Sequence, residues 1–277
     1  DGSCLYSNVK IKPEITQKLS DTLRETSGLI AFDHLLWTHN DDHDNTIYGM
    51  DSNGKIQKKI KLEKGKNNDW EEISQDSSHI YIGDFGNNFQ GKRKNLHLLR
   101  IEKKSFLTNN PAIDTISFSY SNQTDFTEQK ENNTDFDCEA FVVSKDSIYL
   151  FNKQWKQNKT SVYVLPKIPG KYIAKLKETL DVKGLITGAT LLASEKGIVL
   201  CGYSKLLHPF LYLLNDYKNN DFSTGNQRKI KLSLPFHQVE GIATEDGKLF
   251  YATNEFFSKK PFVNVPQQIH TFDLARL

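Results

Sequence analysis

Hydrophobic and polar positions follow one short pattern that repeats five times along the chain. In each repeat a short, mostly apolar run is followed by a polar turn and then by a second run rich in aromatic and β-branched residues. The first runs begin at residues 27, 71, 139, 187 and 240, so successive repeats lie 44 to 68 residues apart. Paired apolar runs at this period predict β-strands in a propeller, a solenoid or another array.

The second runs are expected to be buried central strands. They cover 35–38, 80–83, 148–151, 198–201 and 249–252, and they lack clean polar alternation, which indicates burial on both faces. Third strands are expected at 46–50, 96–101, 161–165, 210–214 and 269–274. More polar fourth strands, typical of outer edges, are expected at 58–62, 115–119, 175–177 and 229–232.

The fifth repeat ends after its third strand, and the alternating segment 7–12 is the candidate for the missing one. A propeller closes its ring when such a strand ties the first blade to the last. The sequence therefore predicts one all-β domain over 1–277, a five-bladed β-propeller of four-stranded blades closed by its N-terminal strand. A sixth blade would need the polar stretch 121–134, which reads as a loop insertion. Apolar residues at intervals of four predict a short helix within 13–25.

The composition argues against some classes of protein, such as nucleic-acid-binding and membrane-spanning proteins. Lys and Arg number 36 and Asp and Glu 34, a net charge of +2, which argues against a nucleic-acid-binding face. No apolar run reaches the roughly 18 residues of a transmembrane helix. Three cysteines without metal-type spacing, Cys4, Cys138 and Cys201, are expected to be buried and unpaired.

The first strands of a propeller line its central channel, so equivalent positions should converge there. Those positions are Ser27, Glu71, Glu139, Thr187 and Glu240. Like charges held close raise one another's pKa unless a cation or donors compensate, and a hard divalent cation such as calcium is one remedy. The metal-ligand candidates are Glu71, Asp84, Glu139 and Glu240. In the structural alternative, each Glu caps backbone N–H groups or binds ordered water.

A second set of candidates lies at the ends of the second strands, beside loops where binding residues gather. A small molecule or a protein partner is expected at this channel mouth, with candidate binding residues His39, Asn40, Asn152, Lys153, Tyr203, Asn254 and Glu255. For His39 the alternative is a hydrogen-bonded rim residue, and for Lys153 a solvated one. Asp84, among glycines and asparagines, equally suits a turn-stabilising role.

Two further features of the sequence, an Asp-rich stretch and a tryptophan, do not by themselves identify a functional site. The stretch 41–45 is rich in Asp but lacks the Gly and Glu of a calcium-binding EF-hand loop, so a solvated loop is expected. Trp155 is either an exposed stacking residue or a loop anchor. The sequence holds no Gly-x-Ser-x-Gly elbow, phosphate-cradling loop or zinc-type Cys/His spacing.

Several of these pieces together resemble a family of secreted bacterial β-propeller proteins, loosely related to the esterase-like phytase, SdiA-regulated and gluconolactonase-type propellers. The pieces are 27–29 with 36–41, 69–73 with 81–88, 137–140, and 240–242 with 253–255. Asp-Trp-Glu followed by Gly-Asp-Phe-Gly-Asn-Asn is the most specific. The resemblance implies the propeller fold, and its better-known cousins bind a divalent cation, often calcium, in the channel. With a chain that begins at Asp1 rather than Met, we expect an extracytoplasmic location, whether periplasmic, cell-surface or secreted.

Three functions fit these observations. The first is a non-catalytic scaffold that binds a ligand or partner at the channel. The second is a metal-dependent hydrolase of the lactonase or phosphoesterase kind, in which Glu71, Glu139, Glu240 and Asp84 surround the cation. The third is a five-bladed glycosidase with Glu139 and Glu240 as its carboxylate pair.

Overall fold

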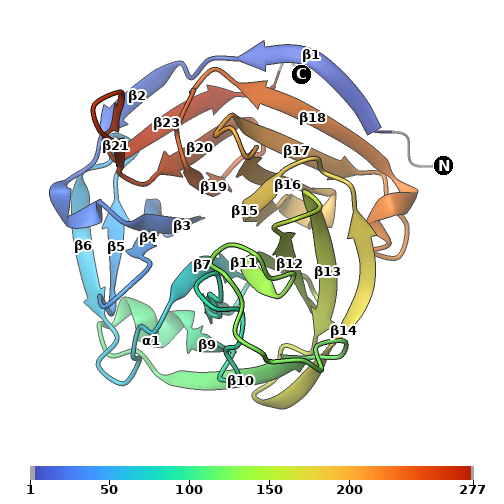
Figure 1. The fold of residues 1–277 in the computed structure, drawn as a ribbon. Coiled ribbons are helices and arrows are strands. Elements are labelled where there is room, and N and C mark those ends of the chain that lie inside the picture. Colours follow the sequence, from blue (N-terminus) through green and yellow to red (C-terminus); the bar gives the residue numbers. More distant parts are fainter. Residues whose placement is uncertain (1–3, 276–277) are drawn as a thin grey trace.

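The computed structural model describes residues 4–275, with side chains from residue 9 onward, and it is almost entirely β. Figure 1 shows short sheets set around a central axis. The first sheet runs outward in the order β3 (Thr26–Phe32), β4 (Leu35–Asn40), β5 (Thr46–Met50) and β6 (Ile56–Lys61). The last has the order β19 (Val239–Thr244), β20 (Leu249–Asn254), β23 (Gln268–Asp273) and β2 (Ile15–Lys18). Both are antiparallel throughout.

The middle of the chain repeats this arrangement. One antiparallel run comprises β7 (Trp70–Gln75), β8 (His79–Asp84), β9 (His97–Glu102) and β10 (Ile113–Tyr120). The next comprises β11 (Asp137–Val143), β12 (Ile148–Gln154), β13 (Lys159–Leu165) and β14 (Gly170–Leu180). Parallel pairing of β10 with β14 joins the two at their outer edges. A third run has β15 (Leu185–Leu191), β16 (Gly197–Tyr203), β17 (Pro209–Asn215) and β18 (Asn226–Leu232).

The remaining elements are short. A hairpin of β21 (Phe257–Lys259) and β22 (Val263–Val265) precedes β23. The one α-helix of the described residues is α1 (Lys103–Leu107), and the 3₁₀ turns are Asp21–Leu23, Ala193–Glu195 and Phe222–Thr224. Within the described chain no helix is long and apolar enough to cross a membrane.

The innermost strands contact one another in sequence, β3 with β7, β7 with β11, β11 with β15, β15 with β19, and β19 back to β3 (Figure 1). The predicted all-β fold is therefore confirmed, and the small antiparallel sheets around one axis are consistent with a propeller. Apolar layers fill the space between neighbouring sheets. Trp37 and Trp70, for example, are fully buried in the layer between the first two. Cys138 and Cys201 are buried and free, whereas the side chain of Cys4 lies outside the described residues.

The N-terminal segment differs from the prediction. The expected closing strand at 7–12 belongs largely to β1 (Cys4–Ile11), which pairs in parallel with β18. The strand that pairs with β23 is instead β2, which we expected to be helical. The periodicity was misleading because Leu19 and Leu23 anchor the 3₁₀ turn in the core, while Ile15 lies 49% exposed on an edge strand.

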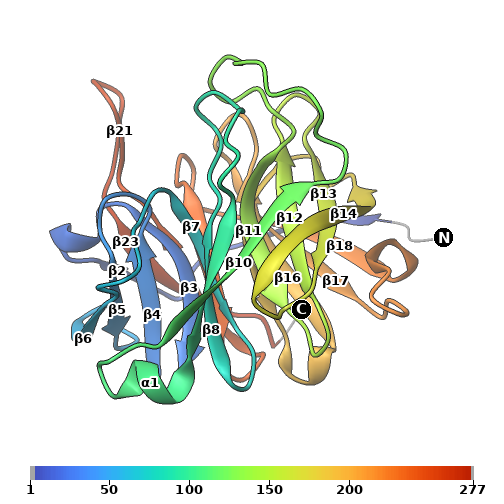
Figure 2. The ribbon, with the colours of Figure 1, turned by 90° about the horizontal axis from the view of Figure 1, so that it is seen from below.

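The loops that carry the candidate residues extend from one end of the molecule. Figure 2 shows the long green loop after β10, together with the β21 hairpin, projecting on the same side. The predicted loop insertion at 121–134 indeed contains no helix or strand. Its residues Glu131 and Asn132 reach the central cavity described below.

Candidate functional site

Each innermost strand carries a β-bulge at the position that the sequence repeat singled out. The pairing register with the second strand shifts at Ser27, Glu71, Glu139, Thr187 and Glu240. A bulge leaves one residue out of the ladder and redirects its side chain, and such irregularities are frequent beside functional sites. We call these five positions the bulge residues.

The hydroxyl members of this set link neighbouring strands. Ser27 Oγ donates a hydrogen bond to the carbonyl of Glu71 at 2.6 Å, and Thr187 Oγ1 donates to the carbonyl of Val239 at 2.5 Å. Each bond ties one innermost strand to the next. Both residues therefore connect neighbouring sheets, and Ser27 also lines the open space that the three glutamates face.

That space, the central cavity, has a volume of about 520 Å³. Its lining is strongly acidic: the carboxylates are Asp41, Asp69, Glu71, Glu131, Glu139, Glu240 and Glu255. The lining cations are Lys153 and Lys205, and the apolar and aromatic residues are Trp155, Leu185, Tyr203 and Leu207. The structure thus brings together six of the metal-ligand and binding candidates predicted from sequence: Glu71, Glu139, Lys153, Tyr203, Glu240 and Glu255.

Lys153 compensates part of this charge. Its ammonium lies 3.1 Å from Glu139 Oε1, 4.5 Å from the ring centroid of Trp155 and 5.6 Å from that of Tyr203. Burial opposes the charged ammonium, but Glu139 and the other acids outweigh burial and raise the pKa of Lys153. Lys153 is therefore a buried, charged residue rather than a solvated one.

The remaining buried acids lack such a counter-charge. Burial, with Asp69 and Glu139 nearby, raises the pKa of Glu71 well above its usual range. The pKa of Glu240 is raised by burial and by Glu255 and Glu139, and its contact with Tyr203 Oη is long, at 3.5 Å. The carboxyl group of Glu71 also shares hydrogen bonds with the carboxyl groups of Asp69 and Glu139.

Asp41, Asp69 and Glu255 extend the acidic lining toward the rim. Burial and the neighbouring Glu255, Glu25 and Asp69 raise the pKa of Asp41 to about 9. Burial raises the pKa of Glu255 to about 8 and that of Asp69 to about 6. Close to neutral pH, this cavity retains protons or requires cations.

Raised carboxyl pKa values predict that stability falls as pH rises from about 6.5 to 8.5. In this window unfolded carboxyls, with a pKa near 4, are ionised, whereas native Asp41 and Glu255 retain protons, so the native state binds more protons. His39 and His270, with native pKa values of about 4 and about 3, oppose this trend, but only until the unfolded imidazoles lose their protons just above pH 6.5. Urea unfolding at both pH values should show the fall. Glu255→Gln should flatten it, and exposed Glu63→Gln should not.

The candidate residues at the ends of the second strands lie on two opposite faces of those strands, because side chains alternate along a strand. Opposite each bulge, the second strand places Asn40, Asp84, Asn152, Gly202 or Asn254. The residue that follows each lies on the other face, and four of these five line the central cavity: Asp41, Lys153, Tyr203 and Glu255. Asn40 lies in an adjoining hollow, and Asn152 and Asn254 are buried away from the cavity.

The polar residues opposite the bulges hold neighbouring loops. Asn40 Nδ2 donates to the carbonyl of Thr22 at 2.9 Å, and Asn152 Nδ2 lies 3.5 Å from that of Asp135. Asn254 donates to Pro266 and accepts from His270 Nε2 at 2.6 Å. They are backbone anchors.

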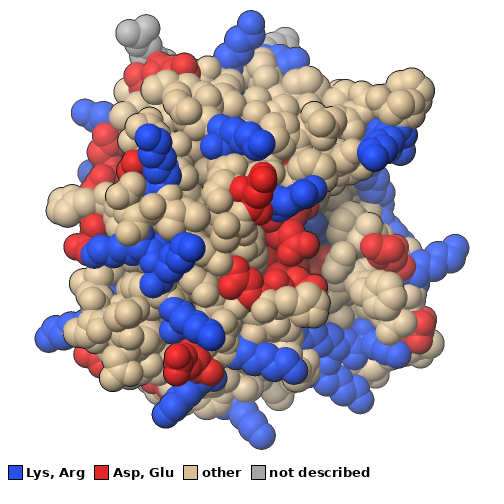
Figure 3. Space-filling view, turned by 90° about the vertical axis from the view of Figure 1, so that its left-hand side faces the viewer, with Lys and Arg blue, Asp and Glu red and all other residues tan. Residues whose placement is uncertain are grey.

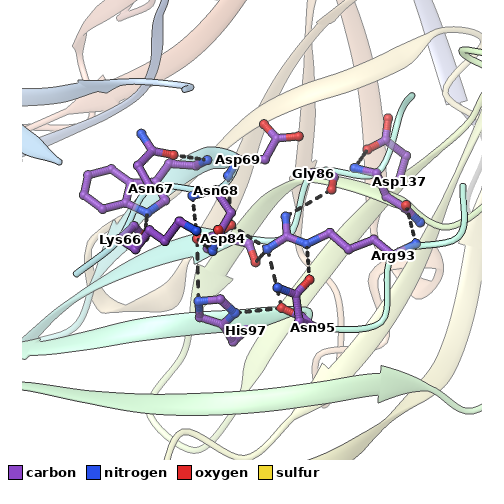
Figure 4. A network of polar contacts seen from close by, with 12 residues as sticks. Lys66, Asn67, Asn68, Asp69, Asp84, Gly86, Arg93, Asn95, His97 and Asp137 are labelled. Atoms are coloured by element: carbon purple, nitrogen blue, oxygen red, sulfur yellow. Dashed lines mark hydrogen bonds and ion pairs between the residues drawn. The ribbon is translucent and has the colours of Figure 1, made fainter. Parts of the chain in front are cut away.

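Asp84 is the strongest of these anchors (Figure 4). It is fully buried, its Oδ1 lies 2.6 Å from Arg93 Nη2, and it accepts hydrogen bonds from the backbone N–H groups of Asn68 and Asp69. These contacts fix the loop that leads into β7 and so position Asp69 and Glu71. Asp84 itself does not line the central cavity, so the structure does not bring it together with the other three proposed metal ligands.

Both ring nitrogens of His39 also form hydrogen bonds within the protein. Its Nδ1 lies 2.9 Å from the carbonyl of Asn40 and must carry the proton, while Nε2 accepts from the N–H of Gly28 at 3.2 Å. Burial lowers its pKa to about 4, so it is neutral at physiological pH. His39 is therefore held by hydrogen bonds, but it is fully buried and does not lie at the rim of the cavity.

Sequence reasoning missed Asp41, Asp69 and the surrounding lining. The position two residues before each bulge could have predicted part of this lining, because side chains two residues apart on a strand share a face. The residues at this position are Glu25, Asp69, Asp137, Leu185 and Gln238. Asp69, Leu185 and Gln238 line the cavity. Asp137 does not line it, but its carboxylate accepts a hydrogen bond from Trp155 Nε1 at 2.9 Å. Trp155 therefore is both anchored and part of the lining.

An outer hollow adjoins the cavity. It shares Asp41 and Glu255 with the cavity, and it is also lined by Asp21, Arg24, Glu25, Asn40, Asp42, Asp44 and Phe256. Figure 3 shows acidic side chains gathered in a hollow on this side of the molecule. Over the described residues, no group of three or more His, Cys, Asp or Glu side chains is arranged to hold a metal ion.

The sequence matches no protein-family model and no curated protein. Two solved structures are distantly similar. A chain of the mitotic checkpoint complex shows 10% identity and a TM-score of 0.40, with 89% of this chain and 60% of that chain covered. A protein of Bacteroides uniformis ATCC 8492, described as a candidate 6-phosphogluconolactonase, shows 12% identity and a TM-score of 0.41, with 87% and 70% covered. At these values neither comparison supports a conclusion about activity.

Proposed function

We propose that this protein is a five-bladed propeller that binds a positively charged ligand in its central cavity. The observation that carries the proposal is the charge of the lining, where seven carboxylates face two lysines. One of those lysines is already paired with Glu139. A bound cation would relieve the repulsion and desolvation that raise the pKa values of Glu71, Glu240 and Glu255.

The five blades of this proposal are the five antiparallel runs that begin with β3, β7, β11, β15 and β19. Each carries one bulge residue on its innermost strand, and β2 completes the last blade. The cation of the proposal is either a divalent ion such as calcium or an organic cation, and the protein binds it without turnover.

Thermal unfolding tests the proposal at pH 8 in EDTA, in millimolar calcium chloride and in a millimolar alkylamine. A ligand that binds only the native state stabilises it by about 2.7 kcal/mol at a hundredfold excess over Kd. We expect stabilisation by at least one of these cations, lost in Glu71→Gln and kept in Glu63→Gln, which alters an exposed carboxylate outside the cavity. If no cation stabilises the wild type, the cavity is not a cation site.

A hydrolase is the second candidate, and one observation favours it. Asp69, with a pKa of about 6, lies in the cavity beside Glu71, and carboxyls tuned toward neutral pH are typical of general acids and bases. In this candidate Asp69 joins Glu71, Glu139 and Glu240 in the cavity, whereas Asp84, which the sequence suggested as a metal ligand, does not line it. Turnover of simple lactones or phosphate esters, abolished by Asp69→Asn, would establish it.

A further inference from the structure

We propose that one end of the molecule docks onto an anionic phospholipid bilayer, with the hairpin of β21 and β22 as its main contact. This end carries the loops that follow β8, β16 and β20, and we call it the loop end. The inference is independent of the cation proposed for the central cavity. It rests on the most exposed apolar side chains of the described residues and on the lysines beside them.

The three most exposed large apolar side chains of the described residues all lie at the loop end. They are Phe262, Leu206 and Phe89, with exposed fractions of 90%, 74% and 68%. Phe89 follows β8, Leu206 follows β16, and Phe262 lies in the hairpin that follows β20. Each of these connections contributes residues to the lining of the one central cavity, so all three leave the sheets at the same end. Exposed apolar side chains gathered at one surface are typical of a contact with a membrane or another protein.

The hairpin presents Phe262 at the tip of a projecting arm. Figure 2 shows the β21 hairpin extending away from the sheets and apart from the other loops. Its strands pair from Phe257 with Val265 to Lys259 with Val263, and the N–H of Phe262 donates to the carbonyl of Lys259 at 3.1 Å to close the turn. The ring of Phe262 therefore has a defined place at the tip, where the described part of the chain leaves it uncovered.

The base of the hairpin is held by the body of the protein. The backbone N–H of Phe256 donates to the carbonyl of Arg24 at 2.8 Å, and the Arg24 guanidinium lies 4.0 Å from the centroid of the Phe256 ring. Asn254 donates to the carbonyl of Pro266 at 2.8 Å, and Val265 is buried. An arm that is already ordered loses little conformational entropy when its tip binds a surface.

Lysines lie beside the exposed apolar side chains, and they favour an anionic surface as the partner. Lys259 and Lys260 are exposed, and within residues 4–275 neither side chain forms an ion pair or a hydrogen bond. Lys205 likewise directly precedes Leu206. Ammonium groups are attracted to acidic lipid headgroups, while an apolar side chain enters the boundary between headgroups and acyl chains. The tip of the hairpin offers both groups together.

The acids of the central cavity lie at the same end, but they are not on the projecting surface. Glu71, Glu139 and Glu240 are buried, with exposed fractions of 5–7%. Physiological salt screens exposed charges beyond about 8 Å. A headgroup at the hairpin tip therefore interacts mainly with Lys259 and Lys260.

Co-sedimentation of the purified chain with lipid vesicles tests the inference. The vesicles contain phosphatidylcholine alone or with about one third phosphatidylglycerol. We expect the chain to bind the anionic vesicles and not the neutral ones. Phe262→Ser should weaken this binding by about tenfold or more, because the ring no longer leaves water for the bilayer. The double variant Lys259→Gln/Lys260→Gln should weaken it by about fivefold for each lysine.

The chain offers a matched control for each variant. Ile168 is 64% exposed in the turn between β13 and β14, at the opposite end, and the neighbouring Lys167 is already paired with Asp76 at 2.9 Å. Lys58 and Lys59 are adjacent exposed lysines on the outer strand β6. We expect Ile168→Ser and Lys58→Gln/Lys59→Gln to bind vesicles as the wild type does.

Three outcomes would overturn the inference. The first is that the wild type does not bind anionic vesicles. The second is equal binding by wild type and Phe262→Ser, which would mean attachment by charge alone. The third is self-association in analytical ultracentrifugation that Phe262→Ser abolishes, without any binding to vesicles, because the loop end would then join two copies of the chain.

One further variant separates this inference from the proposed function. Glu71→Gln removes a carboxylate of the central cavity and should abolish stabilisation by cations, but it should leave vesicle binding unchanged. Vesicle binding without cation binding would support the docking surface alone, and cation binding without vesicle binding would overturn it. Circular dichroism would verify that every variant is folded.

Discussion

Replacing Lys153 with methionine is expected to lower the free energy of unfolding by about 3–5 kcal/mol, the usual cost of removing one partner of a buried ion pair. Lys153 and Glu139 are each about 95% buried at the side chain, with exposed fractions of 4% and 6%. Methionine preserves most of the packing but leaves the Glu139 carboxylate without its counter-charge. Urea unfolding at pH 7.5 measures the loss.

Two further variants make this prediction specific. The double variant Lys153→Met/Glu139→Gln should regain part of the lost stability, because it removes the stranded carboxylate together with its partner. Lys145→Met, at an exposed turn position, should change stability by less than about 0.5 kcal/mol. A Lys153→Met protein as stable as the wild type would mean that Glu139 takes up a proton or another cation at no cost.

Replacing Asp84 with asparagine is the second substitution with a large expected effect, again about 3–5 kcal/mol. Asparagine keeps the shape but strands Arg93, whose side chain is only 14% exposed. It also replaces with an amide the carboxylate that accepts two backbone N–H groups at 3.1 and 3.0 Å. Since this loop positions Asp69 and Glu71, cation affinity should fall as well.

The matched control is Asp114→Asn, which breaks an Arg–Asp pair on the surface. Asp114 lies 3.1 Å from Arg100 Nε and its side chain is 45% exposed, so solvent screens the pair. Exposed pairs contribute about 0–1 kcal/mol. If the two substitutions cost the same, the buried network of Figure 4 does not anchor the loop.

The local sequence predicted strands correctly where burial between sheets requires a run of apolar residues. The apolar runs identified every innermost strand and the second strand paired with it, because both lie between packed sheets. They also placed the five bulge residues at equivalent positions. Outer strands were less predictable, as the entirely exposed β2 shows, because an edge strand buries no face and leaves no periodic signal.

The candidate site was likewise predictable from the sequence only in part. The sequence located the strand ends but grouped Asn40, Asp84, Asn152 and Asn254 with Lys153, Tyr203 and Glu255. Adjacent residues of a strand point to opposite faces, and which face meets the channel follows from the register set by the bulge. Asp41 was expected in a solvated loop, yet it belongs to the acidic lining because Glu255, from a distant part of the chain, lies beside it.

The sequence by itself thus determined the repeated strand pairs, the all-β class and the residues that occupy the bulges, because burial between sheets selects apolar residues at fixed intervals. Tertiary structure alone decided which acids share one cavity, that Lys153 is a buried counter-ion rather than a solvated residue, and which N-terminal strand pairs with β23. These outcomes depend on distances between segments far apart in the chain, and electrostatic interactions of that kind leave no periodicity in the sequence.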